Sequence, residues 1–198
     1  MRFSHHEVKD LWIAGIFISL AFAVLLSGGY NAIFSFNAEI GVYFIISLFT
    51  AGIGFLLHEI MHKFVAQNYG LWAEFRAFYN MLWLALLFSF FGFIFAAPGA
   101  VVIRGKINRE KYGKISLAGP MTNIVLALLF LMGVLILGKT GIRGLFFSLG
   151  LTINSLLAAF NMIPTMPFDG AKILMWHKGI YFITTILAVG LFVISFFA

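Results

Sequence analysis

The sequence predicts an all-α polytopic membrane protein with about five to six transmembrane helices. Of its 198 residues, 62% are hydrophobic and 10% are charged, and the mean hydropathy is +1.03, whereas soluble domains are roughly half apolar. Almost uncharged runs also recur, each near the ~20 residues that cross ~30 Å of hydrocarbon. These runs are residues 11–27, 40–57, 81–97, 117–137, 144–162 and 179–198. No other stretch is long or polar enough for a soluble domain, so we expect a single domain over residues 1–198.

The charged and metal-binding residue types narrow the class further. The net charge is +6, which in so apolar a chain indicates basic cytoplasmic loops and a lipid bilayer as partner, with no nucleic acid. There is no cysteine, so any metal site must use histidine and carboxylate ligands. No feature of the sequence indicates an oligomeric state.

The apolar run 81–97 decides the topology. If it crosses the membrane once, six Lys and Arg residues fall on one side and seven on the other; if it enters and returns, the division is eleven against two. Retained positive charges mark the cytoplasmic side. We therefore expect five full crossings, a re-entrant segment at 81–97 and a cytoplasmic N-terminus. Pro98 and Gly99 break a helix and residues 100–103 favour an extended chain, which predicts a small membrane-associated β element there.

The stretch HEIMH, residues 58–62, places ionisable side chains at the end of an apolar run. His58 and His62 are four residues apart and project from nearly the same helix face, so both can bind one ion. Glu59 lies about 100° around the helix, where it can reach a water held by that ion. This is the metalloprotease pattern H-E-x-x-H. The alternative is a pair of core histidines beside a Glu that reaches to the membrane surface, although ionisable groups within a membrane are usually functional.

A catalytic zinc ion needs a third protein ligand. The chain has seven acidic residues, and five of them are expected in loops or hairpin segments: Glu7, Asp10, Glu39, Glu74 and Glu110. Besides Glu59 this leaves Asp169, which follows Pro164 and Pro167 on broken backbone beside an apolar span. Its alternative role is that of a turn aspartate at a helix start. In the five-crossing topology His58, His62 and Asp169 meet near the cytoplasmic side.

At these residues the chain resembles the site-2 protease family of intramembrane zinc metalloproteases. Three motifs match in order: HEIMH at 58–62, GPMTN at 119–123 and NMIPTMPFDG at 161–170. The resemblance covers about residues 40–178. It implies a catalytic core of three helices at 40–66, 117–137 and 144–163, with β structure at AEFRAFY and GAVVIRG. The chain departs from the family in its apolar insert 81–97 and in lacking PDZ or CBS domains.

The resemblance also implies the roles of the site residues. His58, His62 and Asp169 would bind one catalytic Zn²⁺ per chain, Glu59 would be the general base, and Asn161 would hold the substrate backbone or the oxyanion. The expected activity is that of a zinc metalloendopeptidase of the cell membrane that hydrolyses a transmembrane protein substrate, with its active site towards the cytoplasm. The alternative is a non-proteolytic metal-binding protein or metal transporter.

Three further expectations concern the surroundings of the site. Gly119 and Pro120 are expected to start a helix and to allow close packing. Asn123 is expected to form a hydrogen bond across to the helix that bears the histidines. A strand edge at 73–79 or 100–103 is the hypothetical acceptor of an unwound substrate segment.

Overall fold

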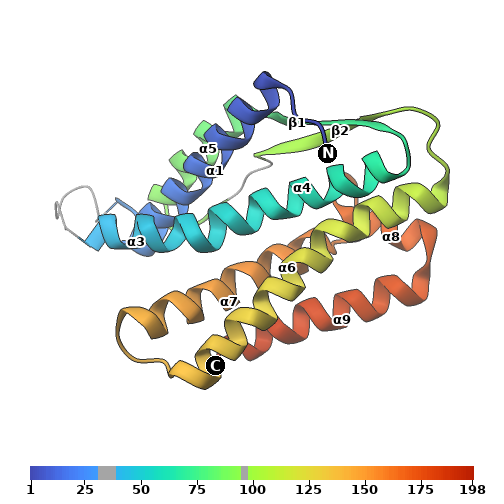
Figure 1. Cartoon of the computed structure of the whole chain (residues 1–198). Coiled ribbons are helices and arrows are strands. Elements are labelled where there is room, and N and C mark those ends of the chain that lie inside the picture. The colour runs from blue at the N-terminus through green and yellow to red at the C-terminus, as the bar shows by residue number, and fades with distance from the viewer. Residues whose placement is uncertain (31–38, 95–97) are drawn as a thin grey trace. The chain divides into compact units, whose positions relative to one another are not determined.

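The structure is a computed structural model that describes residues 1–30, 39–94 and 98–198, and it is largely helical (Figure 1). Four helical spans in it are long and apolar enough to cross a membrane: α1 (His5–Leu26), the continuous span Glu39–Asn68, α6 (Arg109–Leu137) and α7 (Gly141–Asn161). Two apolar helices are shorter, α5 (Tyr79–Phe90) and α9 (Lys178–Ile194). The predicted all-α membrane fold is thus confirmed, and five crossings require α9 as the fifth.

The chain divides into two compact units. Unit 1 comprises residues 1–56 and 74–102, and unit 2 comprises residues 57–73 and 103–198. The single domain expected from the sequence stays a prediction.

In unit 1, α1 packs against the span that begins with α3 (Glu39–Ser47) and continues through a π-helical turn (Leu48–Gly52) into α4 (Ile53–Asn68). A Cβ atom on Gly52 would lie 2.4 Å from the Ser19 hydroxyl, and one on Gly15 would lie 3.0 Å from Leu56. Small residues at these positions let the two backbones approach, as is common between membrane helices.

Strands β1 (Trp72–Ala77) and β2 (Gly99–Arg104) form a two-stranded sheet. The Phe78 N–H donates to the Pro98 carbonyl at 3.0 Å, so the end of β1 lies beside the start of β2 and the strands are antiparallel. Between them α5 has 12 residues, which span ~18 Å at 1.5 Å per residue and are too few to cross ~30 Å. The segment therefore returns to the point it left, as the re-entrant topology requires; its residues 95–97 lie outside the described part.

Two buried acidic residues of α1 bind the edge of β1 that faces away from β2. Glu7 Oε1 accepts from the Phe75 N–H at 2.9 Å, and Asp10 Oδ2 accepts from the Ala77 N–H at 3.1 Å. Asp10 Oδ1 also accepts from the Tyr79 hydroxyl at 2.6 Å. The expectation that Glu7 and Asp10 lie in a loop is therefore wrong: α1 begins at His5, and the two carboxylates are stabilised inside the fold by strand N–H donors.

Unit 2 contains α6, α7, α8 (Asp169–Trp176) and α9, together with the second part of α4. Helices α6 and α7 pack closely because a glycine of each contacts an aromatic ring of the other. A Cβ on Gly133 of α6 would lie 2.1 Å from Phe147 of α7, and one on Gly150 of α7 would lie 2.3 Å from Phe130 of α6. The expected helix start at Gly119 and Pro120 is wrong, because α6 begins ten residues earlier, at Arg109, and Pro120 lies inside it. Asn108 caps this earlier start by accepting from the Lys111 N–H at 2.8 Å.

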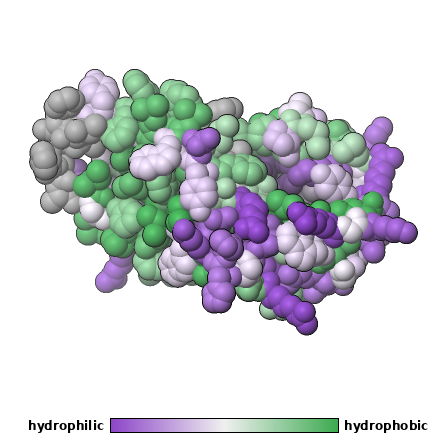
Figure 2. All heavy atoms as spheres, turned by 90° about the horizontal axis from the view of Figure 1, so that it is seen from above, coloured by the Kyte–Doolittle hydropathy of each residue, from purple (hydrophilic) through white to green (hydrophobic). Residues whose placement is uncertain are grey.

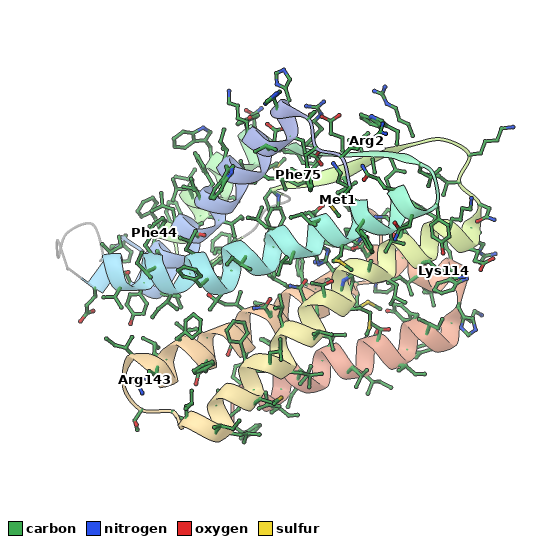
Figure 3. All side chains as sticks on the ribbon, in the orientation of Figure 1. Met1, Arg2, Phe44, Phe75, Lys114 and Arg143 are labelled. Carbon is green, nitrogen blue, oxygen red and sulfur yellow. The ribbon has the colours of Figure 1, made fainter. Side chains whose placement is uncertain are left out.

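The polar side chains are unevenly distributed. Within unit 2, the charged residues Lys114 and Arg143 lie at opposite ends of the helices (Figure 3). Within unit 1, the apolar Phe75 is buried. In the face drawn in Figure 2, apolar side chains cover one broad area and hydrophilic side chains gather in another. An apolar surface of this kind suits contact with lipid.

Candidate metal centre

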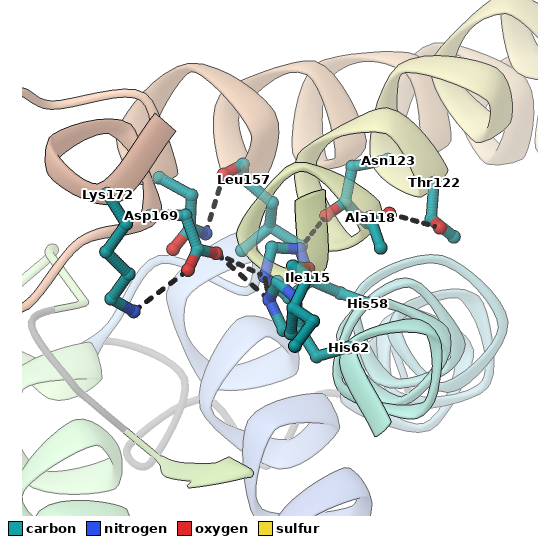
Figure 4. Close-up of polar contacts among 10 residues, drawn as sticks. His58, His62, Ile115, Ala118, Thr122, Asn123, Leu157, Asp169 and Lys172 are labelled. Carbon is teal, nitrogen blue, oxygen red and sulfur yellow. Dashed lines mark hydrogen bonds and ion pairs between the residues drawn. The ribbon is translucent and has the colours of Figure 1, made fainter. Parts of the chain in front are cut away.

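The structure brings His58 and His62 of α4 together with Asp169 at the start of α8, all buried and all within unit 2 (Figure 4). The two Nε2 atoms lie 3.0 Å apart. Asp169 Oδ2 lies 3.4 Å from His58 Nε2 and 3.0 Å from His62 Nε2. Three candidate ligand atoms thus form a compact triangle, as the sequence-based prediction requires.

This triangle has the dimensions of one face of a tetrahedral zinc site. Zinc binds imidazole nitrogen and carboxylate oxygen at about 2.0–2.2 Å, so tetrahedral ligand atoms lie roughly 3.3 Å apart. The three observed separations, 3.0 to 3.4 Å, bracket this value. Two imidazoles and one carboxylate are also a donor set that catalytic zinc sites use. The residues present therefore fit a zinc ion.

The hydrogen bonds behind the histidines fix which nitrogen of each ring is available. His62 Nδ1 lies 2.8 Å from the Ile115 carbonyl oxygen, which can only accept, so Nδ1 carries a hydrogen and, when the ring is neutral, Nε2 has the lone pair. His58 Nδ1 lies 2.5 Å from Asn123 Oδ1. Metal-binding histidines usually donate the other ring N–H in this way. The expected bond from Asn123 to the histidine helix is present.

Gly119 of α6 forms the floor of the triangle. A Cβ atom at this position would lie 2.4 Å from His62 Nε2 and 2.5 Å from His58 Nε2, which is closer than real side chains approach. The next residue, Pro120, has no N–H for the carbonyl four residues before it, which loosens α6 beside the Ile115 carbonyl that holds His62. The close packing expected at Gly119 is thus present, and its partners are the two histidine Nε2 atoms.

Asp169 is placed by a tight turn and a lysine. A Cβ on Gly170 would lie 2.3 Å from the Met162 carbonyl oxygen, so only glycine lets the start of α8 lie this close to the end of α7. Lys172 Nζ donates to Asp169 Oδ1 at 3.0 Å, which leaves Oδ2 facing the histidines. Burial favours the neutral acid, but in the metal-free protein a protonated His62, hydrogen bonds from the two histidines and Lys172 outweigh it and hold the pKa of Asp169 well below its usual range. A bound divalent cation would act in the same direction.

Glu59 and Asn161 do not belong to the triangle of candidate ligand atoms. Glu59 is buried and interacts electrostatically with both histidines and with Asp169. Asn161, the last residue of α7, donates one amide N–H back to the Leu157 carbonyl at 2.9 Å. Only the other N–H of the same nitrogen is left for a substrate oxygen, and the roles of both residues stay predictions.

Sequence reasoning missed three contributors to the site. The Ile115 carbonyl belongs to the backbone and has no side-chain signature, and Asn154 is reached only through Asn123, at 3.1 Å. Lys172 has a local signal, because it lies three residues after Asp169 on the same helix face, but a count of charges per loop does not use this spacing.

The chain is similar to several proteins named as zinc metalloproteases. "Putative zinc metalloprotease MJ0611" of Methanocaldococcus jannaschii is 41% identical over 191 residues, which cover 96% of this chain and 94% of that protein. "Zinc metalloprotease MJ0392" of the same organism is 31% identical over 60% of this chain and 30% of that protein. "Putative zinc metalloprotease YwhC" of Bacillus subtilis is 27% identical over 67% of each. No family model and no solved structure matches. Since the first similarity runs through nearly the whole of both chains, this chain belongs to the same family of zinc metalloproteases.

Proposed function

We propose that the protein is an intramembrane zinc endopeptidase of the site-2 protease type, which holds one catalytic zinc ion through His58, His62 and Asp169. The observation that supports this best is the convergence of three candidate ligand atoms, two of which belong to His58 and His62 on a helical span long enough to cross a membrane. A site in such a span serves a substrate that is itself within or beside the bilayer.

The charges at one end of unit 2 support a cytoplasmic position for the site in the cell membrane. His62 binds the carbonyl of Ile115, the residue after Lys114. Lys111 and Lys114 lie over the rings of Tyr69 and Trp176, at 5.5 and 5.9 Å. Basic residues and interfacial aromatics gather where a helix leaves the membrane on the cytoplasmic side. The N-terminus lies on that same side in the five-crossing topology.

The chemistry divides between the metal and the chain. When bound, zinc lowers the pKa of its water towards ~7 and polarises the peptide carbonyl. Glu59 takes the proton of the attacking water and delivers it to the leaving amine, so that one carboxylate serves first as base and then as acid. Asn161 rotates away from Leu157, or uses its second N–H, to donate to the developing oxyanion. Gly119 excludes side-chain atoms from the point where these groups converge.

A transmembrane helix hides its carbonyls in its own hydrogen bonds and must unwind before it is cut. An unwound segment can add to an exposed strand edge. The outer edge of β1 already binds Glu7 and Asp10. The Phe78 N–H binds the Pro98 carbonyl. Because backbone groups alternate along an antiparallel strand, the N–H and C=O groups of Val101 and Ile103 in β2 then point away from β1. We therefore assign the substrate to the β2 edge rather than to the β1 edge.

A metal transporter or a non-proteolytic metal-binding protein is the second candidate, and it is supported by the ligand triangle alone. Glu59 separates the two, because an ion-transport site needs no general base beside its ligands. Glu59→Gln keeps the size and burial of the side chain but removes its basicity.

The test uses purified wild-type protein and the Glu59→Gln variant. Zinc per chain is measured for both, and both are incubated with a single-span membrane protein with and without chelator. We expect one zinc per chain in each, cleavage by the wild type only, and a loss of about 10²–10⁴-fold or more in the variant. Cleavage by Glu59→Gln at the wild-type rate, or a wild type that cleaves without zinc, would refute the mechanism.

A further inference from the structure

A chain of buried amides runs from His58 through α6 into α7. His58 Nδ1 lies 2.5 Å from Asn123 Oδ1, Asn123 Nδ2 lies 3.1 Å from Asn154 Oδ1, and Asn154 Nδ2 lies 2.9 Å from the Gly150 carbonyl oxygen. Both asparagines are fully buried. The chain lies wholly within unit 2.

The direction of every bond in this chain follows from its last member. A backbone carbonyl oxygen can only accept, so the Asn154 atom that faces Gly150 must be the amide nitrogen. Asn154 then presents its oxygen to Asn123. Asn123 must donate to this oxygen from its amide nitrogen, so its own oxygen faces His58. His58 must therefore donate from Nδ1, and in the neutral ring this leaves on Nε2 the lone pair that a metal needs.

We propose that Asn123 and Asn154 are positioning residues that together hold His58 in its metal-binding tautomer. This inference rests on the proposed function only in taking His58 as a ligand. If the Asn123 amide turned over, two oxygens would face each other at Asn154, and an amide N–H would face His58 Nδ1. The ring would then accept at Nδ1, carry its hydrogen on Nε2 and be unable to bind metal.

Burial makes this control effective. Without water as a substitute partner, an unpaired amide group costs about 1–3 kcal/mol, and each reversed bond leaves two such groups. His62 is controlled differently, by the single backbone carbonyl of Ile115. The two histidines are therefore oriented by independent parts of α6, and a change at Asn154 should affect His58 alone.

The experiment measures zinc binding in the full chain in detergent, by competition with a chelating dye, and needs no protease activity. Asn123→Leu and Asn154→Leu remove the polar groups of the chain but keep the branched shape of the side chain. Asn123→Asp keeps the acceptor for His58. Ser155→Ala is the matched control, because Ser155 is equally buried on α7 but its hydroxyl binds the Leu151 carbonyl at 2.7 Å.

We expect zinc affinity to fall about 10–100-fold in both Leu variants, as for other partners of metal-bound histidines, and to stay within about fivefold of wild type in Asn123→Asp and in Ser155→Ala. A purely structural role predicts the reverse order at position 123, since a buried charge disturbs packing more than leucine does. Wild-type affinity in Asn154→Leu, or equal losses in Asn123→Asp and Asn123→Leu, would overturn the proposal.

A second measurement holds even if a variant fails to fold. Nitrogen-15 spectra of the metal-free wild type, recorded at a pH at which the ring is neutral, should show His58 protonated at Nδ1 and bare at Nε2. The opposite tautomer, or an even mixture, would refute the proposal. A wild type that binds no zinc would instead refute the metal centre and leave this tautomer test in force.

Discussion

Replacing Gly119 by alanine tests the metal centre most directly. The added Cβ would lie 2.4 Å from His62 Nε2, 2.5 Å from His58 Nε2 and 2.6 Å from His62 Cε1. It therefore enters the space between the two ligand nitrogens, and both rings must move for it to fit. We expect Gly119→Ala to fold but to lose most of its zinc affinity.

The size of the loss follows from what holds the rings. His62 is bound to the Ile115 carbonyl and His58 to Asn123. If both hydrogen bonds break, each broken bond costs about 1–3 kcal/mol. A total of about 2–6 kcal/mol corresponds to roughly 30-fold to 10⁴-fold in affinity.

The assay is zinc competition with a chelating dye, with Gly190→Ala as the control. Gly190 lies in α9, also in unit 2, and a Cβ there would meet nothing within 4 Å. Because alanine is the better helix former, this control should bind zinc as the wild type does and gain up to about 1 kcal/mol in the free energy of unfolding. Wild-type zinc affinity in Gly119→Ala would show that the triangle of ligand atoms is not the metal site.

Three further predictions concern topology, substrate and packing. In this cysteine-free chain, Lys111→Cys should react with a membrane-impermeant thiol reagent only from the cytoplasmic side and Arg143→Cys only from the other; labelling of both from one side would exclude the five-crossing topology. Val101→Pro removes an N–H from the proposed β2 edge and should lower kcat/KM for a single-span substrate by about 3–10-fold, the equivalent of one hydrogen bond, with zinc affinity unchanged; Val101→Thr, which keeps the N–H, is its control, and equal kcat/KM in the two would refute this edge. Gly133→Ala places a Cβ 2.1 Å from the Phe147 ring and should lower the free energy of unfolding by about 1–3 kcal/mol with zinc affinity within about twofold; an unchanged denaturation midpoint would contradict the packing of α6 on α7.

Local patterns predicted the part of the site that lies on one helix. His58 and His62 depend only on a spacing of four residues, which any regular helix places on one face. Elimination among the acidic residues predicts Asp169, but one premise of that elimination is wrong. Glu7 and Asp10 are not in a loop but buried in α1, where strand N–H groups bind them. Hydropathy alone treats a carboxylate as a surface group, and its partner in a strand 67 or 68 residues away leaves no local signal.

The remaining contributors depend on how helices meet. The Ile115 carbonyl and Asn154 act only because α6 is seated against α4 and α7 at one particular register. Likewise, Pro120 in the sequence suggested a helix start, but packing and the Asn108 cap extend α6 well before it. A proline inside a membrane helix is tolerated when neighbouring groups occupy the freed backbone. Helix propensity alone does not distinguish a proline at a helix start from a proline inside a helix.

The contacts that support the three proposed ligands indicate that their arrangement does not depend on a bound metal. His62 is held by a backbone carbonyl, His58 by an amide chain anchored on α7, and Asp169 by Lys172 and the close turn at Gly170. None of these contacts needs the ion. The core of unit 2, which includes Leu151, Met162 and Ile173, is equally independent of it. Chelation should therefore abolish cleavage while leaving the helices folded, and zinc should raise the stability only by the mass-action amount RT ln(1 + [Zn]/Kd), about 2.7 kcal/mol at a hundredfold excess over Kd. Loss of helical circular dichroism on chelation would instead mean that the metal builds the site, as it does in zinc fingers.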